Sequence, residues 1–273
     1  MKSKYLVSLH VMMITMVAIN SFAQSGSKTF TIKEEIVNYH SSDGLTLTGF
    51  IAYNGSSDEK LPVVLVVPEW WGVNDYTRMR ARKLAELGYF AMVADMYGNG
   101  KTAVDPKEAQ SLTMPFYQDP HLAKSRLDDA INKIHEYPQA DQGDMAAIGY
   151  CFGGFVVLNA AKLGAGLKGV VSFHGSLGGV SPDKKLLTAK ILICHGGSDK
   201  FVSQQDVGAF KHKMDSIGAT YSFKTYADAT HAFTNPDATK IGKEFSMPIE
   251  YNAKADQDSW NDMKVFLAAL FKK

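Results

Sequence analysis

The sequence predicts an α/β fold in which a mostly parallel central sheet is flanked by helices on both faces. Short, continuous apolar runs indicate the strands: VVLVV (63–67), YFAMVA, MAAIGY, GVVSF (169–173), KILIC and YSFKTYA. Helix-like segments lie between and after these runs, at residues 74–87, 106–116, 121–137, 152–163, 203–217 and 253–271. Strands buried on both faces are apolar throughout, and parallel neighbours need helical crossovers, so this alternation is typical of a covered parallel sheet.

The segments before the first of these runs predict an antiparallel N-terminal hairpin. FTIKEEIVNYH and LTLTGFIAY each alternate polar and apolar residues, and the turn-like residues 41–44 separate them. This pattern is typical of two strands at the edge of a sheet. No repeat, charge block or low-complexity linker interrupts residues 24–273, so we expect one domain there.

Residues 1–23 are predicted to be a signal peptide. Lys2 and Lys4 precede an apolar run that ends in a small-x-Ala site at residues 21–23. A membrane anchor is the alternative, but Asn20 interrupts the run before it reaches the roughly 20 apolar residues that a spanning helix needs. We therefore expect an exported protein, periplasmic or secreted, that begins at Gln24 and is not held at a membrane.

The overall composition argues against several classes of partner. The chain has 29 Lys and Arg against 28 Asp and Glu, so no charge excess favours nucleic acid or an anionic membrane surface. No cluster of His, Cys and carboxylates has metal-ligand spacing, and no phosphate-binding loop follows a strand. The sequence thus implies neither metal nor cofactor, and it leaves the oligomeric state open.

Three polar residues stand just beyond late strands of the predicted sheet. Cys151 follows MAAIGY, Asp199 follows KILICHGGS, and His231 follows YSFKTYADAT. The carboxyl ends of parallel strands meet at one edge of a sheet, and the order nucleophile, acid, histidine is that of the α/β-hydrolases. We expect Cys151 to attack a carbonyl, His231 to transfer the proton and Asp199 to orient the imidazole.

The glycines around Cys151 predict the sharp turn that such a nucleophile needs. A strand that turns directly into a helix leaves no room for a Cβ two residues to either side, where this chain has Gly149 and Gly153. The helix N-terminus then favours both a thiolate and an oxyanion. The backbone N–H groups of Trp70 and Phe152 are the predicted oxyanion donors.

The second cysteine leaves alternatives open. In an exported protein, Cys151 and Cys194 could form a disulfide. A thiol redox protein is a further hypothesis, although the two residues do not form a C-x-x-C pair. We interpret Cys194, inside an apolar run, as a small core residue. A non-catalytic binding protein on a hydrolase scaffold is the main functional alternative.

Further side chains are candidates for the walls of a pocket. Trp71, Tyr76 and Tyr150 suggest an apolar site, although any one of them could be a core residue. His174 and His195 stand at strand ends, where they either line the pocket or satisfy nearby backbone groups.

Five motifs in order resemble the dienelactone hydrolases, a family of the α/β-hydrolase superfamily. The motifs are Glu69-x-x-Gly72-Val73-Asn74, ADMYGNG, GYCFGG, HGGSD and HAF, and the resemblance as a whole covers about residues 35–270. The resemblance implies carboxylic ester or lactone hydrolysis, of the carboxymethylenebutenolidase class, with a triad at Cys151, Asp199 and His231. It also implies that Glu69 contacts the thiol and helps to convert it to a thiolate. The alternative for Glu69 is a solvated loop acid.

One departure from the family concerns charge. Family members hold a substrate carboxylate with arginines, one of them shortly after His-x-Phe, whereas this chain continues with residues 234–236, Thr-Asn-Pro. Its four arginines lie at positions 78, 80, 82 and 126, and Lys101 and Lys107 offer only point charges. We expect a small ester or lactone as the partner, without the arginine clamp.

Overall fold

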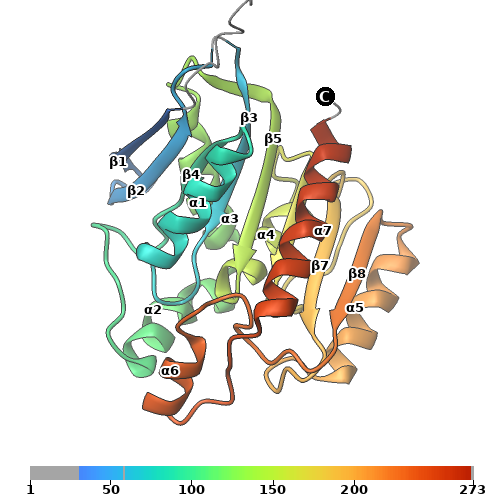
Figure 1. Cartoon of the computed structure of the whole chain (residues 1–273). Coiled ribbons are helices and arrows are strands. Elements are labelled where there is room, and N and C mark those ends of the chain that lie inside the picture. The colour runs from blue at the N-terminus through green and yellow to red at the C-terminus, as the bar shows by residue number, and fades with distance from the viewer. Residues whose placement is uncertain (1–30, 58, 272–273) are drawn as a thin grey trace, which may run out of the picture.

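The computed structural model describes residues 31–57 and 59–271, so the predicted signal peptide lies outside the described residues. Eight strands form one sheet in the order β1-β2-β4-β3-β5-β6-β7-β8 (Figure 1). The pairings β1–β2 and β2–β4 are antiparallel, and the others are parallel, which confirms the predicted fold class and the N-terminal hairpin. The strands are β1 (Ile32–His40), β2 (Thr46–Asn54), β3 (Leu61–Val67), β4 (Phe90–Val93), β5 (Ala140–Tyr150), β6 (Gly169–Phe173), β7 (Lys190–Gly196) and β8 (Tyr221–Tyr226).

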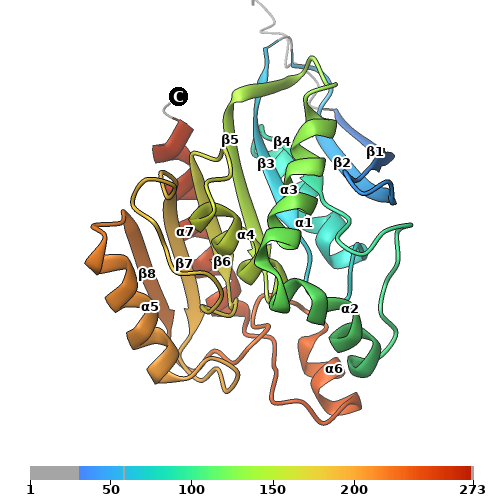
Figure 2. The ribbon, with the colours of Figure 1, turned by 180° about the vertical axis from the view of Figure 1, so that it is seen from behind.

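Helices cover both faces of the sheet (Figures 1 and 2). Helices α1 (Asp75–Glu86) and α7 (Ala253–Phe271) lie on one face, and α3 (Pro120–Ile134), α4 (Phe152–Lys162) and α5 (Gln204–Ser216) lie on the other. Helices α2 (Pro106–Gln118) and α6 (Ala238–Glu244) lie beyond the carboxyl ends of the strands, at the bottom of Figure 1. These two helices therefore stand where the fold places a functional site.

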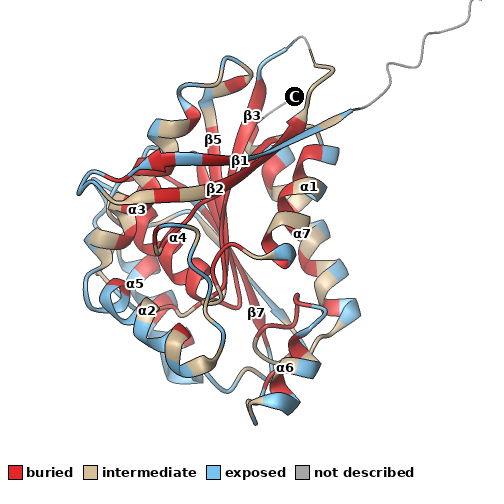
Figure 3. Cartoon of the chain, turned by 90° about the vertical axis from the view of Figure 1, so that its left-hand side faces the viewer, coloured by how far each residue is buried: buried red, intermediate tan, exposed pale blue. Residues whose placement is uncertain are grey.

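The alternation of side chains along the strands explains why the strand sequences are continuously apolar. In β3, Val64 and Val66 pack in the core under α1 and α7. Val63, Leu65 and Val67 pack in the core under α3, α4 and α5. Every residue of β3 is buried, and Figure 3 shows the buried residues concentrated along the sheet. Each such side chain contributes about 1.5–3 kcal/mol of hydrophobic stabilisation.

Local signals start the helices where the sequence predicts them. Asn74 and Thr77 form a capping box at α1, and Ser203 and Asp206 form one at α5, which satisfies N–H groups that the helix itself leaves unpaired. The six predicted helices are all present, with bounds that differ by a few residues because some predicted ranges included the caps.

Helix α6 was not predicted. It has only seven residues, and its N-cap residue Asp237 makes no side-chain capping bond. Its position depends on tertiary contacts instead, because Ala238 and Ile241 pack with Ala232 and Ile249 in a small separate cluster.

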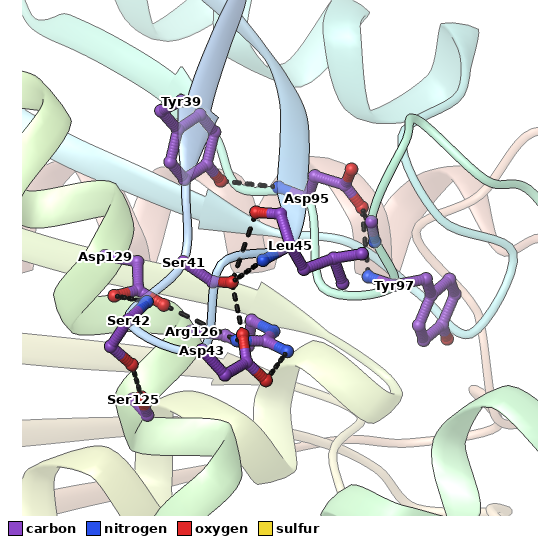
Figure 4. Close-up of polar contacts among 11 residues, drawn as sticks. Tyr39, Ser41, Ser42, Asp43, Leu45, Asp95, Tyr97, Ser125, Arg126 and Asp129 are labelled. Carbon is purple, nitrogen blue, oxygen red and sulfur yellow. Dashed lines mark hydrogen bonds and ion pairs between the residues drawn. The ribbon is translucent and has the colours of Figure 1, made fainter.

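The ADMYGNG segment after β4 is ordered by one carboxylate (Figure 4). Asp95 accepts hydrogen bonds from the backbone N–H groups of Thr48, Tyr97, Gly98 and Gly100. Its own N–H donates to the hydroxyl of Tyr39 on β1. Tyr97, thus fixed, donates its hydroxyl hydrogen to the backbone oxygen of Trp70, 2.9 Å away. This segment therefore supports the loop that follows β3.

A bidentate ion pair ties the hairpin turn to α3, also in Figure 4. Arg126 donates to both carboxylate oxygens of Asp43, at 3.0 and 2.9 Å. Asp43 is largely exposed, so the pair adds geometric definition more than stability.

The turn between β5 and α4 has the tight packing that the glycine pattern predicted. Cys151 has φ +53° and ψ −113°, a conformation that non-glycine residues rarely adopt. A Cβ on Gly149 would lie 2.0 Å from the backbone oxygen of Gly153, and a Cβ on Gly153 would lie 2.2 Å from that of Val67. Only glycine fits at either position. The chain thus projects residue 151 from the end of the sheet.

Replacing Gly153 should therefore break this packing. We expect Gly153→Ala to lower the free energy of unfolding by about 3 kcal/mol or more, because the added methyl group meets backbone that cannot move aside. The matched control is Gly208→Ala in α5, where a Cβ meets no atom within 4 Å. That change should raise stability by about 0.5–1 kcal/mol. Equal urea-denaturation midpoints for the two variants would contradict the described packing.

Candidate active site

The three residues predicted as a triad meet at the carboxyl edge of the sheet. Nε2 of His231 lies 3.0 Å from Sγ of Cys151, and Nδ1 of His231 lies 2.9 Å from Oδ2 of Asp199. Cys151 follows β5, Asp199 follows β7 and His231 follows β8, so three separate crossovers bring them together. The arrangement is a continuous hydrogen-bonded chain from sulfur to imidazole to carboxylate, which has the geometry required of a nucleophile, base and orienting acid.

The electrostatics of the site favour a charged His231 ring beside the sulfur. Burial lowers the pKa of His231, but the neighbouring Cys151 and Asp199 outweigh burial and raise it to about 10. The side chain of Asp199 is fully buried, so its attraction to the ring is little screened by water. An imidazolium in this position stabilises a thiolate, which is the nucleophilic form of cysteine.

Ring contacts fix the orientation of His231. Its ring meets Phe201 edge to face at a centroid distance of 5.0 Å, and it meets His174 in the same way at 5.2 Å. The backbone N–H of Phe201 also donates to Oδ1 of Asp199, at 2.7 Å. The same loop thus holds both the acid and the ring.

The two predicted oxyanion donors occupy suitable backbone positions. Phe152 is the first residue of α4, where an N–H has no acceptor within its own helix. Trp70 lies in a tight turn closed by a hydrogen bond from the N–H of Gly72 to the oxygen of Glu69. Within the described residues, neither the Trp70 N–H nor the Phe152 N–H donates a hydrogen bond. Both are therefore free to bind a ligand oxygen.

Glu69 is a buried carboxyl and not a solvated loop acid. It is 2% exposed and accepts a 2.7 Å hydrogen bond from the side-chain amide of Asn235. Burial raises the pKa of Glu69 to about 7. No sequence pattern pairs Asn235 with Glu69, and the one usable signal is its place four residues after His231.

These residues open onto a cavity of about 340 Å³ with mostly apolar walls. Besides Cys151, His231 and Glu69, the wall is built by the loop after β3, by α2, by the loops after β6 and β7, and by the segment that includes α6. These contribute Trp70, Trp71, Gln110, Thr113, Met114, Tyr117, Ser176, Phe201, Val202, Ala232, Asn235, Ala238, Ile241, Met247 and Ile249. A cavity of this size and character suits a small, weakly polar molecule.

The prediction of pocket residues is wrong for four of the five. Trp71 does line the cavity, but Tyr76, Tyr150, His174 and His195 do not. Tyr150, His174 and His195 stand at strand ends, where side chains alternate between the faces of the sheet, so the position alone does not fix which way they point. Tyr76 lies in α1 and packs into the core.

Each of the four residues is buried against other groups. Tyr150 stacks on Phe173 at 4.7 Å, and His195 packs on Phe223 at 5.6 Å. Tyr76 and His174 bond to Thr234 behind the triad, at 2.6 and 2.8 Å.

The structure also settles the state of the second cysteine. Cys194 is fully buried, and both cysteines are free thiols, so the disulfide alternative is wrong. Burial raises the pKa of Cys194 to about 12, which keeps this thiol protonated and unreactive.

No lysine or arginine lines this cavity in the described part of the chain. Arg80 bonds to Asp256, Arg82 to Glu34 and Arg126 to Asp43, while Arg78 lies 3.7 Å from Asp75. The missing arginine clamp inferred from the sequence is thus a property of the folded site.

Two further observations concern the described residues as a whole. None of their helices combines the length and apolar character needed to span a bilayer. No three of their His, Cys, Asp or Glu side chains are grouped so as to hold a metal ion.

The sheet, the helical layers and the residue at the tight strand–helix turn define an α/β-hydrolase. Within that superfamily the chain belongs to the dienelactone hydrolase family, whose family model matches residues 48–271.

Relatives and solved structures agree with this assignment. An uncharacterized protein of Caenorhabditis elegans is 32% identical over 151 residues, which cover 54% of this chain and 94% of that protein. The putative carboxymethylenebutenolidase of Escherichia coli K12 is 28% identical over 237 residues, covering 81% of this chain and 82% of that protein. A crystal structure of a dienelactone hydrolase-like promiscuous phosphotriesterase from metagenomic libraries is similar with a TM-score of 0.82 and 30% identity, covering 88% of this chain and 99% of that chain. The protein is therefore a hydrolase related to the carboxymethylenebutenolidases.

The buried carboxyl makes a testable contribution to stability. Because the folded state raises the pKa of Glu69 from 4.5 to about 7, folding favours its protonated form. This contribution is fully present below pH 4.5 and is lost as the pH rises through 7. Between about pH 5 and pH 8, the wild type should lose about 3 kcal/mol more unfolding free energy than Glu69→Gln, which keeps an acceptor for Asn235.

Urea denaturation of both proteins across this pH range measures the difference, and all other titrating groups are common to the two. Parallel stability curves would show that Glu69 does not titrate in this way.

Proposed function

We propose that this protein hydrolyses small carboxylic esters or lactones through a covalent acyl-cysteine intermediate on Cys151. The observation that carries the proposal is the chain of hydrogen bonds from Cys151 through His231 to Asp199, whose Cys151 end opens onto a mostly apolar cavity. Family membership supports the reaction class. One relative, at 25% identity, is a probable 2-oxo-3-(5-oxofuran-2-ylidene)propanoate lactonase of Bradyrhizobium, so lactone chemistry occurs among similar proteins.

The first half of the reaction forms the acyl-enzyme. The thiolate of Cys151 attacks the carbonyl carbon, and the carbonyl oxygen becomes an oxyanion that accepts hydrogen bonds from the N–H groups of Trp70 and Phe152. The intermediate collapses when the carbon–oxygen bond of the ester breaks. The His231 imidazolium gives its proton to the departing alkoxide, which leaves as an alcohol.

The second half releases the acid. His231, now neutral, takes a proton from water, and the resulting hydroxide equivalent attacks the thioester carbonyl. Collapse of this second intermediate frees the carboxylic acid and restores the thiolate–imidazolium pair. Asp199 keeps the ring in one orientation throughout, since its carboxylate accepts from Nδ1. A role for Glu69 in switching the thiol to a thiolate remains a prediction from the family resemblance.

The cavity favours substrates without a negative charge. Among the described residues, its wall offers Trp70, Trp71 and Met114 but no lysine or arginine, and Glu69 is the one carboxyl group that lines it. A substrate carboxylate would lose its hydration there, which is costly, without gaining a lysine or arginine partner, and the His231 ring is already bonded to Cys151 and Asp199. Neutral acyl esters and lactones are therefore the proposed substrates.

Export remains a proposal based on the leader-like residues 1–23. N-terminal sequencing of the mature protein, with Gln24 as the expected first residue, tests it.

Removing the nucleophile should abolish turnover. We expect Cys151→Ala to lower kcat/KM for a small activated ester by about a thousandfold or more, because no acyl-enzyme can form. The matched control, Cys194→Ala, removes the other thiol from the core and should retain activity in the folded protein. Mass spectrometry of acid-quenched reactions should find the acyl mass on Cys151 in wild type and Cys194→Ala. Unchanged turnover in Cys151→Ala would refute the mechanism, and reversible ligand binding without an adduct would favour the binding-protein alternative.

The charge preference can be measured with a matched pair of esters. In 4-nitrophenyl succinate a carboxylate replaces the terminal methyl group of 4-nitrophenyl butyrate. We expect kcat/KM to favour the butyrate by about tenfold or more, since no lysine or arginine among the described residues lines the cavity. Met114→Lys places an ammonium group in the wall and should reduce this ratio. Equal kcat/KM values for the two esters in the wild type would contradict the proposed preference.

A further inference from the structure

A group of buried polar side chains lies behind the triad and takes no part in the reaction steps above. His174 directly follows β6 and is 1% exposed, and Thr234, three residues after His231, is fully buried. Tyr76 and Arg80, both from α1, are buried beside them. Polar groups are costly to bury unless they are paired, so this cluster calls for an explanation.

His174 binds the backbone of the nucleophile. The N–H of Cys151 donates to Nδ1 of His174 at 3.1 Å and also to the backbone oxygen of Phe173 at 3.0 Å. A ring nitrogen that accepts a hydrogen bond carries no proton, so the proton of His174 is on Nε2. Nε2 then donates to Oγ1 of Thr234 at 2.8 Å. Burial, with the nearby His231 and Arg80 charges, also lowers the pKa of His174 well below its usual value.

Thr234 is held at both its side chain and its backbone. Its hydroxyl shares a 2.6 Å hydrogen bond with that of Tyr76, and its backbone oxygen accepts from Nη2 of Arg80 at 2.5 Å. Arg80 in turn pairs with Asp256 of α7 at 2.6 Å. Helices α1 and α7 therefore fix the hydroxyl group that orients the His174 ring.

His174 links the buried polar cluster to Cys151 and His231. Cys151 has φ +53°, a conformation that persists only where its surroundings enforce it. His174 bonds to the amide of that residue, and its ring lies edge to face with His231 at 5.2 Å. One side chain thus contacts both partners of the sulfur–imidazole hydrogen bond.

We propose that His174 is a positioning residue for the reaction. Its neutral ring, oriented by Thr234, holds the Cys151 amide and supports the His231 ring, so that sulfur and imidazole stay within hydrogen-bonding distance. The proposal rests on the proposed function in that Cys151 is the nucleophile.

Substitutions of His174 can distinguish the role of its hydrogen-bond acceptor, Nδ1, from the role of its side-chain volume. Oδ1 of asparagine is as many bonds from Cα as Nδ1 of histidine, and asparagine tolerates the positive φ of 41° found here. His174→Asn therefore keeps an acceptor for the Cys151 N–H, whereas His174→Leu does not. We expect His174→Leu to lower kcat by about tenfold to a hundredfold with KM changed less than about twofold, and His174→Asn to recover most of kcat.

A second pair of variants leaves His174 itself unchanged. Thr234→Val keeps the shape of the side chain but removes the hydroxyl that orients the ring, and Thr234→Ser keeps that hydroxyl. We expect Thr234→Val to lower kcat several-fold and Thr234→Ser to restore it. The control is Ser41→Ala in the N-terminal hairpin turn, which removes a buried hydroxyl bonded to the backbone of Leu45. It should lower stability without changing kcat.

The deciding measurement is the rate at which iodoacetamide alkylates Cys151, taken well below the melting temperature of each variant. A merely structural role for His174 would leave this rate unchanged, whereas a positioning role predicts slower alkylation in His174→Leu and Thr234→Val than in their asparagine and serine counterparts. Folded His174→Leu and Thr234→Val proteins with wild-type kcat and alkylation rates would overturn the proposal, and so would a His174→Asn variant no better than His174→Leu.

Alkylation does not require turnover. If Cys151→Ala retained activity, the proposed function would fail while the alkylation rates still reported on the position of the thiol, so the two failures are distinguishable.

Discussion

The close contact between the end of β3 and the turn at Cys151 is the constraint on which the rest of the structure depends. Gly153 packs so tightly against the backbone oxygen of Val67 that no side chain fits between them. This contact lets α4 begin directly after Cys151, with the N–H of Phe152 unpaired at its start. A longer or looser turn would separate the sulfur from the helix N-terminus, and with it from the partial positive charge that favours an anion.

The segment that follows β8 contributes several side chains to the candidate site. Within residues 231–235, His231 faces the sulfur, Thr234 contacts His174 and Asn235 holds Glu69. The backbone oxygen of Phe233 also accepts from the N–H of Asn252 at 3.1 Å. These five consecutive residues therefore connect His231, its neighbour His174 and the buried carboxyl of Glu69. The position of each depends on the others, because all are displaced if this segment moves.

The distribution of charge explains why the site differs from a carboxylate-binding one. Three of the four arginines join separate elements: Arg80 joins α1 to α7, Arg82 joins α1 to β1, and Arg126 joins α3 to the hairpin turn. Among the described residues, the cavity is lined by the carboxyl group of Glu69, whose burial favours its neutral form, and by Cys151 and the His231 ring, whose pKa is raised by its neighbours. The rest of the cavity wall is mostly apolar.

The sequence by itself determined the sheet class, the hairpin, the six longer helices and the tight turn at Cys151, because each is encoded locally by periodicity, capping residues or glycine. It also predicted which three residues meet, since parallel strands bring their carboxyl ends to one edge. Only the tertiary structure decided that Tyr150 and His174 are buried away from the cavity, that α6 forms, and that Glu69 pairs with Asn235. Those outcomes depend on which face of the sheet a strand-end side chain points to and on contacts between residues up to 166 positions apart. No local sequence pattern specifies either.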